Sequence, residues 1–234
     1  MMNARKCSLI MGSAVVVLSS LAAGAQTTTD LPTPPRRAEV PAASAIPQDD
    51  CLERLKRGGI AIEAAGASPQ NNAACAIASP VILVSVADSK ISGLSIAFSD
   101  RPRVSCAMAE KFAYFSRDIV APLARGIFDR DLVAISTGPG HECRPRNRQS
   151  GAKLSSHGQG NALDVSAMEL SGRFKITIEN PGNPAAERLI AGIRAAACGV
   201  FNTVLGPGSD AAHRDHIHLD IEMRGRDGRS KLCQ

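Results

Sequence analysis

The sequence lacks several features that would assign it to a common class of protein. It contains no Cys-x-x-Cys pair, so a cysteine-based zinc site has no support. Its apolar run Leu9–Leu21 is shorter than the roughly 20 residues that a membrane-spanning helix needs, and no later stretch is a better candidate. No internal repeat is visible, which argues against a repeat array. These absences favour a single soluble domain.

Residues 1–25 have the features of a secretory signal peptide. Arg5 and Lys6 precede the apolar run, and Ala23-Gly24-Ala25 fits the small-x-small cleavage rule. We therefore expect residues 1–25 to be removed and the mature chain to be periplasmic or secreted by a bacterium. Cleavage reduces the 27 basic residues to 25, against 22 acidic ones, so the net charge falls from +5 to +3. This charge does not call for nucleic acid, although it is compatible with a negatively charged cell wall.

Six cysteines remain after signal removal, and an even number in an exported protein predicts three disulfides formed in an oxidising compartment. They are Cys51, Cys75, Cys106, Cys143, Cys198 and Cys233. Six cysteines allow many connectivities, and the count alone does not choose among them. We expect Cys51–Cys75, Cys106–Cys143 and Cys198–Cys233, because each of these pairs brackets one contiguous segment.

Two regions follow the predicted signal peptide. Residues 26–50 are rich in Thr, Pro and Ala and can bury too little apolar surface to fold, so an extended tether is expected. Residues 51–234 form the expected globular domain, which is long enough for one core.

Three helices are predicted in this domain, at 52–57, 105–128 and 184–197. Ser105 can cap the second helix, and Pro122 should kink or divide it. Asn183 can cap the third helix, and Gly199 is expected just past its end.

Seven strands are predicted from apolar runs and alternation: 60–63, 80–87, 131–137, 162–166, 174–178, 201–205 and 216–222. A turn near Ser171-Gly172 is expected to join the strands 162–166 and 174–178. Strands and helices are mixed without regular β-α-β alternation. This order favours an α+β fold with a central, mostly antiparallel sheet flanked by helices.

Histidines and aspartates gather in two short segments, 155–164 and 213–220. Alternation in the last predicted strand places His216, His218 and Asp220 on the face opposite its aliphatic residues. Asp164 likewise lies opposite Leu163 and Val165. Two strands can therefore present Asp164 and His218 to a common point.

His157 must reach that point from a loop, where Gly158 and Gly160 give the backbone freedom to turn. A catalytic zinc takes three protein ligands and leaves a fourth position for water. The candidate ligands are His157, Asp164 and His218, with Asp215 as the base beside the open position. His141 stands apart from these segments and is interpreted as a loop residue.

The segment Ser155-x-His157-x-x-Gly160-x-Ala162-x-Asp164 matches the motif of the zinc D-Ala-D-Ala carboxypeptidases and related peptidoglycan metallopeptidases. Asp215-His216-x-His218 resembles their second motif, an acidic residue three positions before a zinc histidine. More closely, the region from Cys51 to Cys233 resembles the bacterial extensin-like C-terminal domain family, an offshoot of that group. Cys143-Arg144 contributes to this likeness, as do Cys198, Leu205–Gly208 and His213–Asp220.

The resemblance implies a fold like that of the D-Ala-D-Ala metallopeptidases and hedgehog, with Zn2+ on His157, Asp164 and His218. It implies Asp215 as general base. Two departures are visible. The dipeptidases of the group carry Glu and Trp near the final histidine, where this chain has Asp215 and no tryptophan anywhere. The group's substrate-gripping arginine lies in a Gly-Tyr-Arg-like loop, where this chain has Cys143-Arg144.

The expected hydrolysis also predicts roles for residues that are not zinc ligands. His216 is expected to stabilise the oxyanion, and Arg144 to grip a carboxylate of the substrate. Ser155 is the second expected substrate-binding residue. His213 and Asp220 are candidates for holding the ligating histidines through hydrogen bonds, although a solvated strand-end carboxylate is an equal interpretation of Asp220.

The leading hypothesis is a hydrolase: a zinc metallopeptidase that cuts a D-amino-acid-containing bond in peptidoglycan stem peptides, either as a carboxypeptidase or as an endopeptidase. A rival hypothesis is a wall-binding module that keeps the fold and the metal without chemistry. A third is a structural zinc site closed by His216 or Asp215 as fourth ligand. A monomer without nucleic-acid partners and without a transmembrane helix after signal removal is expected in each case.

Overall fold

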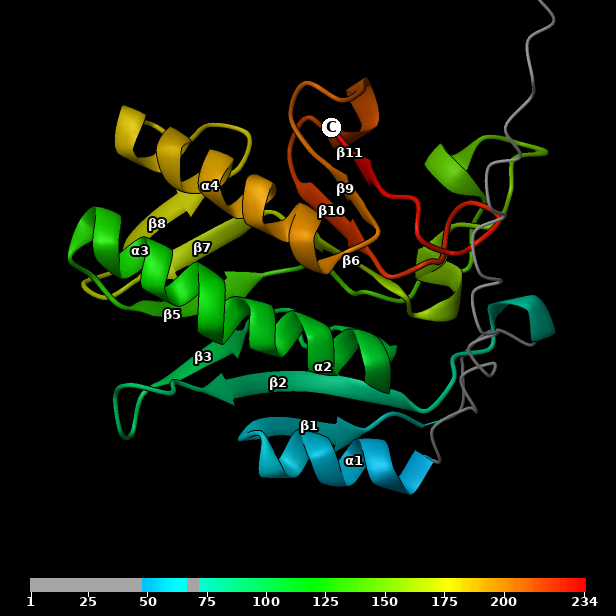
Figure 1. The fold of residues 1–234 in the computed structure, drawn as a ribbon, viewed down its shortest axis with the longest axis horizontal. Helices are drawn as coiled ribbons and strands as arrows, with labels where there is room; N and C mark the ends of the chain where they lie inside the picture. Colours follow the sequence, from blue (N-terminus) through cyan, green and yellow to red (C-terminus); the bar gives the residue numbers. More distant parts are fainter. Residues whose placement is uncertain (1–47, 67–71) are drawn as a thin grey trace, which may run out of the picture. The chain divides into compact units, whose positions relative to one another are not determined.

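The computed structural model describes residues 48–66 and 72–234. The predicted signal peptide and residues 26–47 of the predicted tether lie outside the described residues. Helix α1 (Gln48–Arg57) begins within the last residues assigned to the tether. The described chain is α+β, as the order of its elements predicted (Figure 1).

The larger sheet has seven strands in the order β1-β2-β3-β5-β7-β8, with β4 also paired to β2. All its neighbouring strands are antiparallel except β3 and β5, which are parallel. The strands are β1 (Ile60–Ala64), β2 (Pro80–Ala87), β3 (Ser95–Phe98), β4 (Arg103–Ser105), β5 (Leu132–Ser136), β7 (Ala167–Leu170) and β8 (Phe174–Thr177). The apolar run Val81–Val86 lies in β2, between β1 and β3, and the side chains of Val81, Leu83 and Val86 are buried in the core.

A second sheet of four strands carries the candidate site, in the order β11-β9-β10-β6. Its strands are β6 (Ala162–Val165), β9 (Thr203–Leu205), β10 (Ile217–Asp220) and β11 (Leu232–Cys233). The prediction of one central sheet was therefore incomplete. β6 and β7 are separated only by Ser166, yet they belong to different sheets, so the chain passes from one sheet to the other at this residue.

The predicted turn near Ser171-Gly172 exists, but it joins β7 to β8 and not the strand of Asp164 to β8. β6 pairs with β10 instead. The prediction failed because it left out β7, whose Ala167, Met168 and Leu170 are buried against the core. Burial of these apolar side chains holds the segment in the larger sheet.

The predicted helix 105–128 is confirmed, and it is divided before Pro122. It consists of α2 (Cys106–Phe115), a short π-helix η2 (Ser116–Val120) and α3 (Ala121–Phe128). Ser105 caps α2, with its Oγ accepting a hydrogen bond from the Met108 amide at 3.2 Å. Pro122 lies in the first turn of α3, where its missing N–H costs least. The apolar face of α2 packs in the core, where Phe112 is 1% exposed.

Helix α4 (Pro184–Val200) packs beside α3 (Figure 1). The Asn183 side chain accepts from the Ala186 amide at 3.0 Å, which confirms the predicted cap. The predicted end at Ala197 was wrong, because α4 continues through Gly199 to Val200. Gly199 does not take the left-handed conformation with which a glycine ends a helix, and the chain leaves α4 at the buried Phe201.

Three disulfides join Cys51 to Cys106, Cys75 to Cys143 and Cys198 to Cys233, with Cα–Cα distances of 6.3, 5.6 and 5.9 Å. The third pairing was predicted correctly and the first two were wrong. Closure of local segments was the wrong criterion. Helix α1 packs against α2 and brings Cys51 to Cys106, while η1 (Ala73–Cys75) lies beside the loop that carries Cys143. Three disulfides are typical of a protein that folds in an oxidising compartment.

Among residues 48–66 and 72–234, no helix has the length and apolar character needed to cross a membrane.

Candidate metal centre

Two neighbouring strands place Asp164 and His218 opposite each other. β6 and β10 are antiparallel, and His218 is the direct partner of Asp164 in their register. Leu163 and Leu219 are both fully buried on the other face of this pair. The alternation predicted from the sequence is therefore confirmed, and it directs the two polar side chains to the same side of the sheet.

His157 is delivered by a tight helical turn, η4 (Ser156–Gln159). The Ser155 Oγ caps this turn by accepting from the His157 amide at 3.4 Å. Gly160 ends the turn with φ of 66°, and a Cβ at this position would lie 2.8 Å from the backbone nitrogen of Ser105. Glycine is therefore required both by the left-handed conformation and by the close approach of α2.

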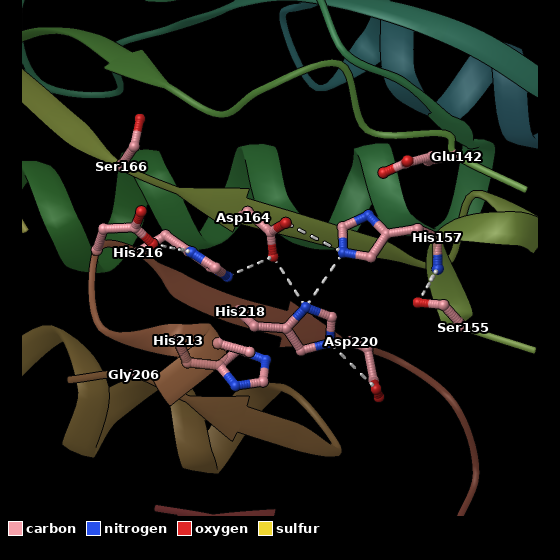
Figure 2. Close-up of polar contacts among 12 residues, drawn as sticks. Glu142, Ser155, His157, Asp164, Ser166, Gly206, His213, His216, His218 and Asp220 are labelled. Carbon is pink, nitrogen blue, oxygen red and sulfur yellow. Dashed lines mark hydrogen bonds and ion pairs between the residues drawn. The ribbon is translucent and has the colours of Figure 1, made fainter. Parts of the chain in front are cut away.

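The three predicted ligand residues converge on one point (Figure 2). His157 Nε2 lies 3.2 Å from Asp164 Oδ2, and His218 Nδ1 lies 2.9 Å from Asp164 Oδ1. The two histidine nitrogens are 3.2 Å apart. Tetrahedral ligands about 2.1 Å from a zinc ion would be about 3.4 Å from one another, so the observed separations are close to those of a metal site. Two imidazoles and one carboxylate are also a donor set that suits zinc.

Hydrogen bonds from outside the group orient both rings. His157 Nδ1 donates to the Gly140 carbonyl at 2.7 Å, which leaves the lone pair of Nε2 facing the other two ligands. His218 Nε2 faces Asp220 Oδ2 at 3.5 Å, so its Nδ1 faces Asp164. Asp220 is 2% exposed and accepts from the Glu222 amide at 3.1 Å. The structure thus places Asp220 behind His218, as the first interpretation of this residue predicted.

The charges of His157, Asp164 and His218 favour binding of a proton or a cation. Burial alone would lower the pKa of His218, but hydrogen bonds with Asp164 and Asp220 outweigh it and raise that pKa to about 9. Burial would raise the pKa of Asp164, but its contacts with His157 and His218 hold it well below its ordinary value. A carboxylate that stays ionised between two imidazoles provides the charge and the lone pairs that a divalent cation needs.

The convergent group lies in a cleft of about 600 Å³. Four arginines line this cleft together with several carboxylates, so the cleft is strongly polar and suits a charged substrate. The arginines are Arg144, Arg146, Arg148 and Arg224. Ser155, Asp215 and His216, which the sequence analysis singled out, also line it.

Residues 49–234 match the family model described as Extensin-like protein C-terminus. The chain belongs to this extensin-like family. No curated protein and no solved structure matches the chain. The family assignment confirms the closer of the two resemblances seen in the sequence.

In this extensin-like domain Asp215 does not point at the convergent atoms. It accepts from His216 Nδ1 at 2.8 Å, and this hydrogen bond lowers the pKa of Asp215. His216 Nε2 then lies 3.6 Å from Asp164 Oδ1, at the edge of the group. Asp215 and His216 therefore form a pair beside the three candidate ligands, with the imidazole of His216 on the side of Asp164 (Figure 2).

The predicted hydrogen-bonding role of His213 takes a different form. His213 Nδ1 lies 2.6 Å from Asp210 Oδ1, so this ring is held by Asp210 and does not bond to a candidate ligand. Its ring centre is 5.6 Å from that of His218 and 5.3 Å from that of His216. Burial lowers the pKa of His213 more than Asp210 raises it. This lowered pKa favours the neutral ring, and His213 is the fourth imidazole that lines the cleft, with His157, His216 and His218.

The extensin-like domain also uses two residues that the sequence analysis did not assign to the site. His141 Nε2 lies 3.1 Å from the Gly158 carbonyl and 3.2 Å from the Cys75 carbonyl, and so holds the turn that carries His157. Glu142 accepts from Arg144 Nε at 2.8 Å and from Arg148 Nη2 at 2.9 Å. Burial would raise the pKa of Glu142, but the two arginines outweigh it and lower that pKa.

These contacts depend on loop geometry, which sequence spacing does not reveal. The only sequence signal for the roles of His141 and Glu142 is the high proportion of charged residues in the segment 141–148.

Proposed function

We propose that this extensin-like domain is a zinc-dependent peptidase that hydrolyses a D-amino-acid-containing peptide bond in peptidoglycan. The observation that carries the proposal is the convergence of His157, Asp164 and His218 in a polar cleft. The resemblance of the two motifs to those of zinc D-Ala-D-Ala carboxypeptidases supplies the metal, the reaction and the class of substrate.

The donor set supports a catalytic site over a structural one. Among the residues that the structure describes, the convergent group has three members, and His216 and Asp215 are engaged with each other. Three protein ligands leave a position for a reacting molecule. Zinc bound there would polarise the scissile carbonyl and make the attacking water more acidic.

The Asp215–His216 pair is suited to proton transfer. Asp215 holds the proton of His216 on Nδ1, so the lone pair of Nε2 faces the site. Nε2 can take the proton of the attacking water and return it to the leaving amine, while Asp215 stabilises the charged ring. The base role predicted for Asp215 is thus proposed to act through His216.

Arg144 supports recognition of a carboxylate. Its Nε is held by Glu142, and within the described chain neither Nη group makes a hydrogen bond. A guanidinium fixed at one edge keeps the other donors available in one orientation, which favours bidentate binding of a substrate carboxylate. Ser155 contributes indirectly, because its hydroxyl caps the turn of His157.

The test is digestion of defined muropeptides by the purified mature protein, with and without a metal chelator. Cleavage that stops in chelator and returns with zinc supports the peptidase, and the masses of the products identify the bond. Zinc binding and muropeptide binding without any cleavage would favour the wall-binding module instead.

A further inference from the structure

A second hollow, of about 410 Å³, lies on the other side of the candidate metal ligand Asp164. Asp164, Asp215 and His216 line both this hollow and the arginine-lined cleft. Figure 2 shows Asp164 between Ser166 and His216 on one side and His157 and Glu142 on the other. The second hollow is further lined by Ser136, Thr137, Gly138, Ser166, Ala167, Lys175, Thr177 and Glu179. The candidate metal centre therefore lies between two hollows.

The lining of the second hollow is small and rich in hydroxyl groups. The Ser166 hydroxyl donates to the Ser136 carbonyl at 3.3 Å, and the Thr177 hydroxyl donates to the Asn180 carbonyl at 2.8 Å. Because each hydroxyl uses its proton in this way, its lone pairs remain available to accept N–H groups of a ligand. Such a lining suits the main chain of a peptide.

The charged side chains of the two hollows differ in whether they form ion pairs within the protein. In the first cleft Arg144 and Arg148 are paired with Glu142, and Arg146 is paired with Glu222. In the second, Lys175 and Glu179 are exposed, and neither forms an ion pair within residues 50–66 and 72–234. An ammonium and a carboxylate without internal partners can pair with a ligand that carries a free carboxylate and a free amine.

We propose that the second hollow binds the part of a peptide that lies beyond the scissile bond, with Lys175 pairing with a carboxylate of that peptide. This inference rests on the proposed function and narrows it: the domain cuts internal bonds of cross-linked peptides and acts as an endopeptidase. Removal of a terminal residue needs a site that is closed on one side. Here the rim of the hollow is formed by exposed residues, namely Ser166, Lys175 and Glu179, so the bound chain can continue outward.

Four variants test the proposal with zinc-loaded protein. Ser166→Tyr fills the hollow, and Ser95→Tyr places the same side chain on an exposed serine of β3 as its control. Lys175→Glu reverses the proposed contact, and Lys90→Glu reverses an exposed lysine outside both hollows. The substrates are a cross-linked muropeptide dimer and the matching uncross-linked monomer. Zinc content is measured for each protein.

We expect the wild-type protein to cut the dimer with a kcat/KM at least about tenfold above that for the monomer. Only the dimer reaches the second hollow, and contacts remote from the scissile bond can lower the barrier to cleavage. Ser166→Tyr and Lys175→Glu should each lower kcat/KM for the dimer by about tenfold, with zinc content unchanged, and both controls should match the wild type. Equal rates on dimer and monomer, together with no effect of Ser166→Tyr, would overturn the second binding site and leave the peptidase intact.

Binding separates this proposal from the proposed activity. Affinity for the dimer is measured by calorimetry in the Asp215→Asn background, with and without Lys175→Glu. If no muropeptide is cleaved by any protein but Lys175→Glu weakens dimer binding by about tenfold, the peptidase fails and the binding site stands. If Lys175→Glu leaves dimer affinity unchanged, the binding site is refuted whether or not cleavage occurs.

Discussion

At the scale of single residues, the identity of the neighbour decides what each polar side chain can do. Asp164 and Asp215 are both aspartates at the same site. The two oxygens of Asp164 each face a ring nitrogen of His157 or His218, whereas Asp215 is half exposed and accepts from the outer nitrogen of His216. We therefore propose that Asp164 binds the metal and that Asp215 assists proton transfer through His216.

The first prediction separates these two roles. Asp215→Asn should leave zinc stoichiometry unchanged, because Asp215 does not face the convergent atoms. It should lower turnover by at least about 10²-fold, the lower range for a general acid–base group. Zinc analysis and muropeptide turnover are measured on the same preparation. His218→Ala is the comparison, and it should lose both zinc and activity. An Asp215→Asn protein that loses its zinc would instead make Asp215 a ligand.

At the scale of elements, the turn η4 and the loop 141–148 hold the site together. Both are short segments without a core of their own, and each is fixed by contacts to a more rigid part of the fold. The His157 turn packs against the start of α2 at Gly160, and the loop is fixed to η1 through Cys143 and Cys75.

The second prediction concerns Gly160. Gly160→Ala should weaken zinc binding, because its Cβ would lie 2.8 Å from the Ser105 backbone and displace the turn that carries His157. Gly93→Ala is the control, since Gly93 also has a positive φ, of 80°, but has no atom within 4 Å of the added Cβ. The control should lose about 1–2 kcal/mol of stability through its backbone conformation and should keep its zinc affinity. Calorimetric zinc titration and denaturant unfolding measure the two effects, and equal zinc affinities in both variants would contradict the packing argument.

The third prediction concerns the disulfide that anchors the arginine loop. Replacing Cys75 and Cys143 together by serine should raise KM for muropeptides severalfold, because Arg144 and its partner Glu142 adjoin Cys143. Zinc content should change less than KM, since the three candidate ligands lie outside this loop and the turn of His157 keeps its cap at Ser155 and its packing at Gly160.

The matched variant for this prediction is the double serine replacement of Cys198 and Cys233, which link α4 to β11. It should lower stability and leave KM unchanged. A similar rise of KM in both variants would show that general loosening of the fold, and not release of the arginine loop, is responsible.

At the scale of the whole molecule, the charge at the buried site is linked to folding. Contacts with Asp164 and Asp220 raise the pKa of His218 to about 9 despite its burial. An ordinary histidine in the unfolded chain has a pKa of about 6.5. The proton on His218 therefore stabilises the metal-free fold fully below about pH 6.5, and this contribution is lost as the pH rises through about 9.

The fourth prediction follows from this linkage. The denaturation midpoint of chelator-treated protein should fall between about pH 7 and 9. Zinc needs the unprotonated ring, so the stabilisation that zinc adds should grow over the same range. Unfolding curves with and without zinc at several pH values measure both trends. A metal-free midpoint that does not change across this range would contradict the assigned role of the His218 proton.

Features that depend on near neighbours along the chain could be predicted from the sequence. Alternation with a period of two residues placed Asp164 and His218 away from the aliphatic face, because successive side chains of a strand point to opposite sides. Ser105 and Asn183 were recognised as helix caps for the same kind of local reason, since each cap bonds an amide only three residues away. The α+β class also followed from the order of the elements.

The meeting of distant segments could not be predicted from the sequence. Cys51 bonds to Cys106 because α1 packs on α2, and Cys75 bonds to Cys143 because η1 packs beside a loop, neither of which spacing along the chain reveals. The engagement of Asp215 by His216 and the division of the strands into two sheets have the same origin. Such contacts depend on the shape in which the buried apolar surfaces pack, and that shape is a property of the whole folded chain.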